Sequence, residues 1–392
     1  MWALYAISAV PVMIQGALLA QQNNFLIFRW SFGHLISGHD LYAFDTAHYA
    51  DQFKYSPTFA LLFAPLAAIP FAPALLIWCI VNALALAFAL TLLLPRRAAA
   101  VALAITYLEM VGAMQNGQSN SLVASTVILA FIAFEREESL LGGALASLGA
   151  VIKIYPLAAL ATAIPRRTTL RAIGATVLSL VILLALPAAF TPGGFAGLAA
   201  QYRSWHAIEL LDAATPEGRP YGMLGGLMQM VRVWLDVRLP NWPIQMAGTA
   251  ILLLPLALRR SAWSDPRFRL SFLASLLVYV LLFNHQAEPP SFVVGIAGIA
   301  IWYAAGPMTR VRTIFTLGVV AAVSLPGTSI FGAHFYKDIF IRYSLKTFPV
   351  AVAWCVMEFE LLTGKEAIVI SPWWSRARTA GDLSAASSRS RS

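Results

Sequence analysis

The sequence is short of charged residues. Of its 392 residues, 11% are charged and 59% are hydrophobic, whereas soluble domains are about 25% charged and about 45–50% apolar. A soluble fold needs polar side chains to cover its surface, and this chain has too few of them. The scarcity of charge therefore excludes a soluble globular protein and predicts an integral membrane protein.

Cysteine and the common catalytic motifs are also scarce. The two cysteines, Cys79 and Cys355, both lie inside apolar runs, which excludes a disulfide framework and a cysteine metal site. The chain has no zinc-ligand spacing, no nucleophile elbow and no glycine-rich dinucleotide fingerprint. These absences remove the nucleotide-dependent and zinc-dependent enzyme classes from consideration.

Long apolar runs are abundant. A membrane helix needs about 20 apolar residues, and the candidate spans are 1–20, 72–94, 98–114, 120–134, 169–190, 243–258, 268–284, 290–305, 312–330 and 347–363. No cleavage site follows the first run, so we expect a retained helix there and not a signal peptide. The pattern predicts an all-α, polytopic helical bundle with about ten to twelve membrane segments.

Residues 140–164 differ from the other runs. The apolar stretches 140–152 and 157–164 are each too short to span at about 1.5 Å per residue. Pro156 separates them and disfavours helical backbone at Tyr155. We therefore predict a broken or re-entrant pair of half-helices with Lys153 and Tyr155 near its tip, although one tilted span remains an alternative.

The arginines indicate the orientation. With the N-terminus in the cytoplasm, twelve arginines fall in short inside loops, between Arg96 and Arg312, as the positive-inside rule requires. The outside face then carries the polar segments 21–56, 114–120, 191–242 and 284–290, with a smaller one at 331–346. We expect one transmembrane domain, 1–370, with large loops at 21–56 and 191–242, and a basic, disordered cytoplasmic tail at 371–392.

The first polar segment carries three acids close together. A carboxylate there suits a general base or a cation ligand, and an ordinary solvated loop is the alternative. Asp40 is the best candidate because Gly38 allows a tight turn before it. Asp45 is second, and Asp51 looks more like a charge at a helix end.

Two further patterns suit a sugar and a phosphate. Asn116, Gln118 and Asn120 form an amide-rich turn, and amides both donate to and accept from hydroxyl groups, although helix capping explains them equally well. Lys153 is flanked by apolar half-helices, where a cation needs an anionic partner such as a lipid phosphate. A lysine that reaches to the interface is the alternative.

The later polar segments add fewer candidates. Arg203 and His206 flank Trp205 in a stretch that suits an amphipathic helix at the membrane interface. His285 and Glu288 lie in a short turn between two apolar helices. Short polar turns of this kind are common places for functional residues, and His285 is suited to hold a phosphate.

The order of these motifs resembles a known family. The elements are Asp40 with Tyr42, the run Lys54-Tyr55-Ser56-Pro57, the turn 116–120, Gly142-Gly143 and the run Lys153-Ile154-Tyr155-Pro156. They resemble the bacterial polyprenol-phosphate-mannose-dependent α-1,2-mannosyltransferase-like family of the glycosyltransferase C superfamily, mainly over residues 35–165. Two later features differ, because only His285 stands where a histidine pair is common and the large loop lacks an Asn-Gln-Ser segment.

The resemblance implies a membrane glycosyltransferase of the bacterial inner membrane, with its active site facing the periplasm or exterior. It implies a polyprenyl-phosphate sugar (mannose or another hexose or pentose) as donor, a glycan or glycolipid acceptor, inversion, and no cofactor or required divalent metal. Asp40 would be the catalytic base. The expected substrate-binding residues are Tyr42, Asp45, Lys54, Tyr55, Asn116, Gln118, Asn120, Lys153, Tyr155, Arg203, His206, His285 and Glu288.

Two other functions fit the same residues. A transporter or flippase for an anionic lipid-linked substrate would place its charges near the midplane of both halves, whereas here they gather at one face. A non-catalytic subunit of envelope glycan synthesis would need none of the acids for chemistry.

Overall fold

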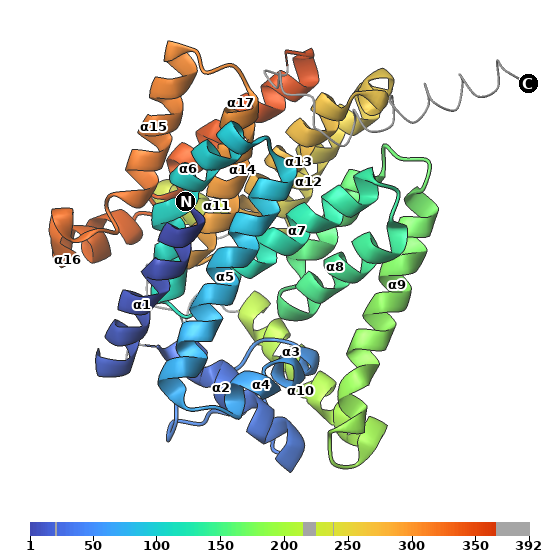
Figure 1. Ribbon diagram of the computed structural model, residues 1–392, viewed down its shortest axis with the longest axis vertical. Coiled ribbons are helices and arrows are strands. Elements are labelled where there is room, and N and C mark those ends of the chain that lie inside the picture. The colour runs from blue at the N-terminus through green and yellow to red at the C-terminus, as the bar shows by residue number, and fades with distance from the viewer. Residues whose placement is uncertain (20–21, 215–224, 238, 366–392) are drawn as a thin grey trace, which may run out of the picture.

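The computed structural model describes residues 1–19, 22–214, 225–237 and 239–365 (Figure 1). Within these residues every regular element is a helix and no strand occurs. Five of the helices are long and apolar enough to cross a membrane, namely α1 (Trp2–Leu19), α5 (Phe71–Leu93), α6 (Arg96–Gln115), α9 (Thr169–Ala185, continued by the turn η2, Leu186–Ala189) and α12 (Asn241–Leu258). The predicted all-α membrane bundle is confirmed.

Shorter helices complete the bundle. They are α7 (Asn120–Glu135), α8 (Ser139–Ile152), α13 (Pro266–Leu282), α14 (Phe292–Ala305, preceded by the turn η4, Pro289–Ser291), α15 (Arg310–Ser324) and α17 (Thr347–Thr363). Apart from α8, which belongs to the predicted broken pair, they coincide with predicted spans, except that α15 ends at Ser324, earlier than the predicted 330. Pro326 lies just beyond this end and has no backbone N–H with which to continue the helix.

The polar segments hold helices as well. These are α2 (Asn23–Ser37), α3 (Pro57–Leu62), α4 (Ala64–Ala67), α10 (Gly194–Ala214), α11 (Leu227–Leu235), η3 (Arg260–Ser264), α16 (Gly332–His334) and the π-helix η6 (Phe335–Ile341). The described part of 191–242 is therefore largely helical, whereas in 21–56 the helix α2 is followed by an irregular stretch at 38–56. The tail predicted at 371–392 lies outside the described residues.

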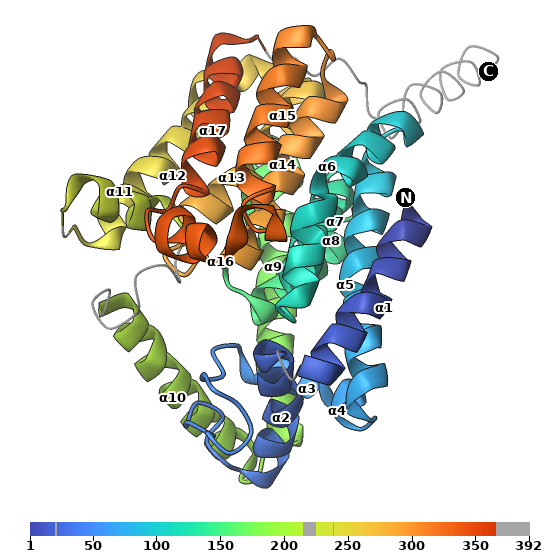
Figure 2. The same ribbon diagram turned by 90° about the vertical axis from the view of Figure 1, so that its left-hand side faces the viewer.

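Helix α2 is anchored by aromatic packing. Phe25 and Phe28 are fully buried and meet the rings of Phe63 and Trp78 at centroid distances of 5.1 to 5.9 Å within one cluster. The helix ends at Gly38, whose backbone is left-handed with φ of 77°, a conformation that glycine adopts most readily. In Figures 1 and 2, α2, α3, α4 and α10 lie together beyond one end of the bundle, and we call this end the site face.

Residues 139–163 form the predicted broken pair. Helix α8 ends at Ile152, Lys153 is extended (φ −144°, ψ 135°), and the 3-10 helix η1 (Tyr155–Ala163) then returns along α8. Gly149 permits the close return, because a Cβ on it would lie 2.7 Å from Cβ of Pro156. Arg166, after η1, donates to the carbonyl of Glu135 before α8 (3.1 Å). Both ends of this hairpin therefore lie at one end of the bundle, with Lys153 at its tip.

Buried charges hold the opposite end together. The Arg269 guanidinium donates two hydrogen bonds to Glu135, with Nε–Oε1 2.7 Å and Nη2–Oε2 2.8 Å, and Arg166 approaches the same carboxylate at 3.8 Å. Glu135 ends α7 and Arg269 lies in the first turn of α13. Since α7 is 16 residues long, about 24 Å at 1.5 Å per residue, this basic end is well separated from Asn120 and the site face.

The outer surface of the bundle suits lipid. Along α9, Val177, Leu178, Val181 and Ile182 are all more than half exposed. In water this apolar stripe would be unfavourable, whereas lipid tails solvate it. The exposed stripe is thus the face of a membrane-embedded helix.

We predict that Glu135→Gln destabilises the fold by about 3–5 kcal/mol, because it leaves the buried Arg269 guanidinium without its anionic partner. Chemical unfolding of the protein in detergent micelles measures this. Arg267→Gln is the control, since Arg267 pairs with Asp265 at the surface and its side chain is 53% exposed. That variant should change stability by less than about 1 kcal/mol, and equal losses in both would contradict the assignment.

Candidate active site

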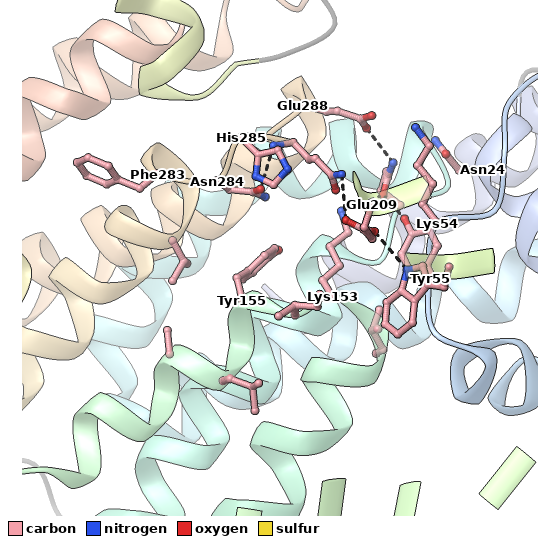
Figure 3. Close-up of a pocket in the computed structure, with 18 of the residues that line it drawn as sticks. Asn24, Lys54, Tyr55, Lys153, Tyr155, Glu209, Phe283, Asn284, His285 and Glu288 are labelled. Atoms are coloured by element: carbon pink, nitrogen blue, oxygen red, sulfur yellow. Dashed lines mark hydrogen bonds between the residues drawn. The ribbon is translucent and has the colours of Figure 1, made fainter. Parts of the chain in front are cut away.

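A cavity of about 460 Å³ opens at the site face. Its walls come mainly from four parts of the chain: the start of α2 with residues 51–55, the hairpin tip 152–158, helix α10, and the end of α13 with the turn 283–288. Gln118, between α6 and α7, and Gln245 of α12 complete the lining. Figure 3 shows labelled side chains from all four parts around one space. Segments far apart in the sequence therefore converge on a single site.

Lys153 is the cation at the hairpin tip. Its ammonium donates to Asn120 Oδ1 (2.8 Å) and to Gln118 Oε1 (3.4 Å), and it lies 5.9 Å from the centre of the Tyr55 ring. Burial lowers the pKa of Lys153, and the nearby Glu288 carboxylate opposes that shift. The partners on the protein are thus mostly neutral amides, which leaves the positive charge available to an anionic ligand.

Two tyrosines offer hydroxyl groups beside Lys153. Tyr55 OH donates to Gln118 Oε1 (3.2 Å), and burial raises the pKa of Tyr55 well above its ordinary value. Tyr155 lines the cavity, and its buried hydroxyl has no hydrogen-bond partner among the described residues. Burial raises the pKa of Tyr155 too, so this hydroxyl remains a donor for a ligand oxygen.

The first polar segment is folded back to carry Tyr55. Tyr42 OH donates to the Tyr55 carbonyl (2.8 Å), and Gln52 Nε2 donates to the Tyr42 carbonyl (2.9 Å). At the start of α3, Ser56 accepts from the Phe59 N–H and caps the helix. Tyr42 therefore holds the backbone of Tyr55 in place and does not itself line the cavity.

The turn after α13 is held on two sides. From the cavity side, Gln118 Nε2 donates to Glu288 Oε2 (3.1 Å). From behind, Lys346 donates to Glu109 Oε2 (2.8 Å) and to the Pro289 carbonyl (3.3 Å), and both ion-pair side chains are at least 91% buried. Gly225 N–H also donates to the Ala287 carbonyl (2.6 Å). These contacts fix the turn that carries His285 and Glu288.

Helix α10 supplies the last wall. Trp205 Nε1 donates to Glu209 Oε1 (3.2 Å), and Gln286 Nε2 donates to Glu209 Oε2 (3.4 Å). All three side chains line the cavity. The carboxylate of Glu209 therefore links α10 to the turn after α13.

The sequence model of glycosyltransferase family 87 matches residues 53–284. The match covers more than half of the chain and contains Lys54, Gln118, Lys153 and Glu209. The chain belongs to glycosyltransferase family 87. No curated protein matches it. Because this is a family of GT-C-like membrane enzymes, the chain is a membrane glycosyltransferase that uses a sugar donor and an acceptor.

Most of the predicted residues of this glycosyltransferase gather at the cavity. Those that line it are Lys54, Tyr55, Gln118, Lys153, Tyr155, His285 and Glu288. Asn120 contacts the cavity through its bond to Lys153. The structure thus brings together the amide-rich turn, the Lys-x-Tyr-Pro run and the turn after α13, as the sequence predicts.

The other predicted residues lie elsewhere. Asp40 is exposed, accepts from the Tyr42 N–H (3.1 Å) and does not line the cavity. Asp45 lies outside it as well and pairs with His48 (2.7 Å) and His34 (3.2 Å). Asn116 caps the end of α6 through the Gly112 carbonyl (2.8 Å). The role of Asp40 as base remains a prediction that this geometry does not support.

Arg203 and His206 are exposed on α10 and do not line the cavity. The cavity instead contains polar residues to which the sequence assigned no role at the site, namely Asn24, Asp51, Trp205, Glu209, Gln245 and Gln286. Gln201, Trp205 and Glu209 are spaced four residues apart. That spacing puts them on one helix face and is the pattern that identifies this wall.

No group of three His, Cys, Asp or Glu side chains in the described ranges is arranged to hold a metal ion. The polar residues that line the cavity are mainly hydroxyl, amide and cationic groups, which bind oxygen-rich ligands directly.

We predict that Gly226→Ala lowers transfer activity, because a Cβ there would lie 2.6 Å from the Asn284 carbonyl oxygen and would displace the turn that carries His285. Gly174→Ala is the control, since nothing lies within 4 Å of its added Cβ. That variant should keep activity and gain about 0.5–1 kcal/mol of helix stability. Sugar transfer and thermal unfolding of the two variants test this, and full activity of Gly226→Ala would contradict the close contact.

Proposed function

We propose that this glycosyltransferase moves a sugar from a polyprenyl-phosphate donor to a glycan or glycolipid acceptor, with inversion at the anomeric carbon. The sugar is mannose or another hexose or pentose. The main support is Lys153, a half-buried cation with amide partners, which lies in one cavity with Lys54 and His285. A cluster of this kind suits a phosphodiester at the edge of the bilayer.

The apolar side of the cavity supports a lipid-linked donor. The same lining that holds the cationic groups includes Ile154, Leu157, Val280 and Phe283, from the hairpin tip, η1 and the end of α13. A phosphate beside Lys153 would therefore lie where polar groups give way to apolar ones, as a lipid phosphate requires. A soluble nucleotide sugar has no comparable use for the apolar half.

The chemistry needs one base and a stabilised leaving group. A carboxylate takes the proton of the acceptor hydroxyl while its oxygen bonds to the anomeric carbon, and the bond from that carbon to the phosphate oxygen breaks. The phosphate leaves with the electron pair, and Lys153 and His285 stabilise its charge. A single displacement inverts the anomeric carbon. Because a lipid phosphate leaves as a stable anion, the scheme requires neither a general acid nor a metal.

Asp51 is our choice for the base. It belongs to the same segment as Asp40, but it lines the cavity, with an exposed carboxylate that accepts from the Gln52 N–H (2.7 Å). The other two carboxylates of the lining, Glu209 and Glu288, are half-buried and accept from side-chain amides of the protein, whereas Asp51 is exposed. Asp51 is therefore the acid most able to accept a proton from a substrate.

The orientation follows from the arginines. Arg166 and Arg269 lie at the end of the bundle opposite the cavity, and short loops rich in arginine remain in the cytoplasm. We infer that the cavity opens to the periplasm or exterior of the bacterial inner membrane.

We predict that Asp51→Asn lowers transfer by at least about 10²-fold, the usual loss when a general base is removed, while Asp40→Asn keeps most of it. The measurement is sugar transfer by the purified protein in liposomes, with a panel of polyprenyl-phosphate sugars and a crude envelope lipid extract as acceptor. Circular dichroism and thermal unfolding check that each variant is folded.

The other outcomes are decisive as well. If Asp40→Asn lost sugar transfer and Asp51→Asn kept full activity, Asp40 and not Asp51 would be the general base. Absence of transfer from every lipid-linked donor would refute the donor class, and movement of the donor across the bilayer without transfer would favour a transporter.

We predict that donor affinity falls as pH rises into the alkaline range. Burial lowers the pKa of Lys153, so its ammonium loses a proton at a lower pH than an exposed lysine, and the phosphate then loses its cationic partner. Lys153→Arg should remove this alkaline loss because arginine stays charged, and Lys153→Met should weaken binding at every pH. Titration of a polyprenyl-phosphate sugar from neutral to alkaline pH measures this, and identical profiles for wild type and Lys153→Arg would refute it.

A further inference from the structure

The segment 45–50 leads directly into the cavity lining. In Figure 2 the irregular stretch 38–56, to which this segment belongs, lies between α2 and α10, and hydrogen bonds join the stretch to both helices. Asp45 does not line the cavity, whereas Asp51, the proposed base, does. Asp51 is exposed, so its position depends mainly on how the chain on either side of it is held.

One face of α2 holds this segment. Asn23, Trp30 and His34 are spaced seven and four residues apart, which places them on the same side of a helix. Asn23 accepts from the Ala50 N–H (2.7 Å). The Trp30 ring lies against the ring of His48, with centroids 3.7 Å apart. Two attachments therefore fasten the later half of the segment to α2.

Asp45 makes the third attachment. Its Oδ2 lies 3.2 Å from Nε2 of His34 on α2 and 2.7 Å from Nδ1 of His48 in its own segment. Its carbonyl accepts from the His48 and Tyr49 N–H groups (both 3.1 Å), which closes a turn. One carboxylate thus joins the turn to the helix, and it also holds His48 in place against Trp30.

The chain is also held beyond Asp51. The Gln52 N–H donates to Asp51 Oδ1 (2.7 Å), and the Gln52 side chain donates to the Tyr42 carbonyl (2.9 Å). Tyr42 OH in turn donates to the Tyr55 carbonyl (2.8 Å). Asp51 therefore lies between a segment fastened to α2 and a segment fastened to Tyr55, and loss of either attachment would let its carboxylate move.

We propose that Asp45 and His34 are positioning residues of the transfer reaction: their contact holds the segment 45–50 on α2 and thereby places the carboxylate of Asp51 at the cavity. Neither side chain lines the cavity, so both act through Asp51 and not on the substrate. This role rests on the proposed function of Asp51 as base, but the attachment itself is measurable without any donor.

Protonation of His34 should weaken the attachment. Burial lowers the pKa of His34, the Asp45 carboxylate opposes that shift, and His39 and His48 add to it. The His34 ring also lies 6.0 Å from that of His39 and 6.3 Å from that of Tyr49. A histidine whose pKa is lowered in the folded segment is favoured there in its neutral form. The attachment is therefore complete above about pH 6.5, the ordinary histidine pKa, and weakens as pH falls below it.

The first test is amide hydrogen exchange of the full-length protein in detergent, measured by mass spectrometry over residues 45–50. Asp45→Ala should speed exchange of the His48, Tyr49 and Ala50 amides at least about tenfold, the scale of one lost hydrogen bond to a charged group, and should leave exchange in the helices of the bundle unchanged. Unchanged exchange over 45–50 would refute the proposal, because the segment would then be held without Asp45.

Asp338→Ala is the matched control. Asp338 pairs with His334 (2.6 Å) as Asp45 pairs with His48, but both side chains of that pair are more than half exposed and neither lines the cavity. This variant should keep the exchange of 45–50 and the rate of sugar transfer. Equal effects of Asp338→Ala and Asp45→Ala would contradict a specific role for Asp45.

The second test is kinetic. Asp45→Ala should lower kcat for transfer at least about tenfold and leave KM for the donor within about twofold. Asp45→Glu keeps the carboxylate and should restore most of the rate. A raised donor KM with unchanged kcat would show that Asp45 binds the donor and would overturn the proposal.

A double-mutant cycle tests whether Asp45 acts through Asp51. If it does, Asp45→Ala should cause no further loss of transfer once Asp51→Asn is present, whereas additive losses would overturn the proposal. Full activity in Asp51→Asn alone would refute the base and this role together. Absence of transfer from every lipid-linked donor would refute the donor class, and faster exchange in Asp45→Ala would still support the attachment.

The pH dependence gives a readout that a simple loss of structure would not change. The ratio of kcat in wild type to kcat in His34→Gln should fall toward one as pH decreases below about 6.5, because groups that titrate in both proteins cancel from the ratio. A ratio that stays constant from neutral to acidic pH would show that protonation of His34 does not affect the attachment, and would refute its contact with Asp45 as the cause.

Discussion

A cation inside an apolar bundle needs polar partners. The hydrogen bonds that Lys153 makes determine which segments of the chain meet at the cavity. The ammonium bonds to Asn120 and Gln118 at the start of α7, and Gln118 also binds Glu288 beyond the end of α13. A charged group at membrane depth is unfavourable unless it is solvated by protein or water. The helix break at residues 153–155 places Lys153 at a hairpin tip, where both kinds of solvation are available.

The same constraint explains the two buried ion pairs. Glu135 with Arg269 closes the basic end, and Glu109 with Lys346 lies behind the cavity. Such pairs contribute little net stability, since desolvation offsets most of the attraction, but they demand one geometry. Lys346 also bonds to the Pro289 carbonyl, so its pairing with Glu109 fixes where the turn with His285 lies. We infer that this pair positions the site and that the Glu135 pair positions only the helices.

The sequence predicts much of this, because hydropathy and local breakers act over short distances. Apolar runs indicate the membrane helices and Pro156 indicates the break, and the candidates Gln118, Asn120 and Lys153 lie within hydrogen-bonding distance of one another. The prediction of Asp40 rests on Gly38 before it and on the family resemblance. Its carboxylate instead closes a local turn onto the Tyr42 N–H, and only the path of the chain back to Tyr55 determines that Asp51 meets the cavity. The direction of a side chain in such an irregular segment depends on tertiary contacts, and a short stretch of sequence does not reveal these contacts.

Helix α10 is a second example of a segment in which the sequence alone does not show which side chains face the cavity. Within the five residues Tyr202 to His206, the sequence analysis selected the polar side chains Arg203 and His206 as site candidates and not Trp205. Yet successive helical residues turn by about 100°, so Arg203 and Trp205 cannot both face the cavity. Gln201 decides between them through its two bonds to residues 39 and 41. That anchor involves neither Lys153 nor its hairpin, so separate contacts position α10 and the hairpin tip at one cavity.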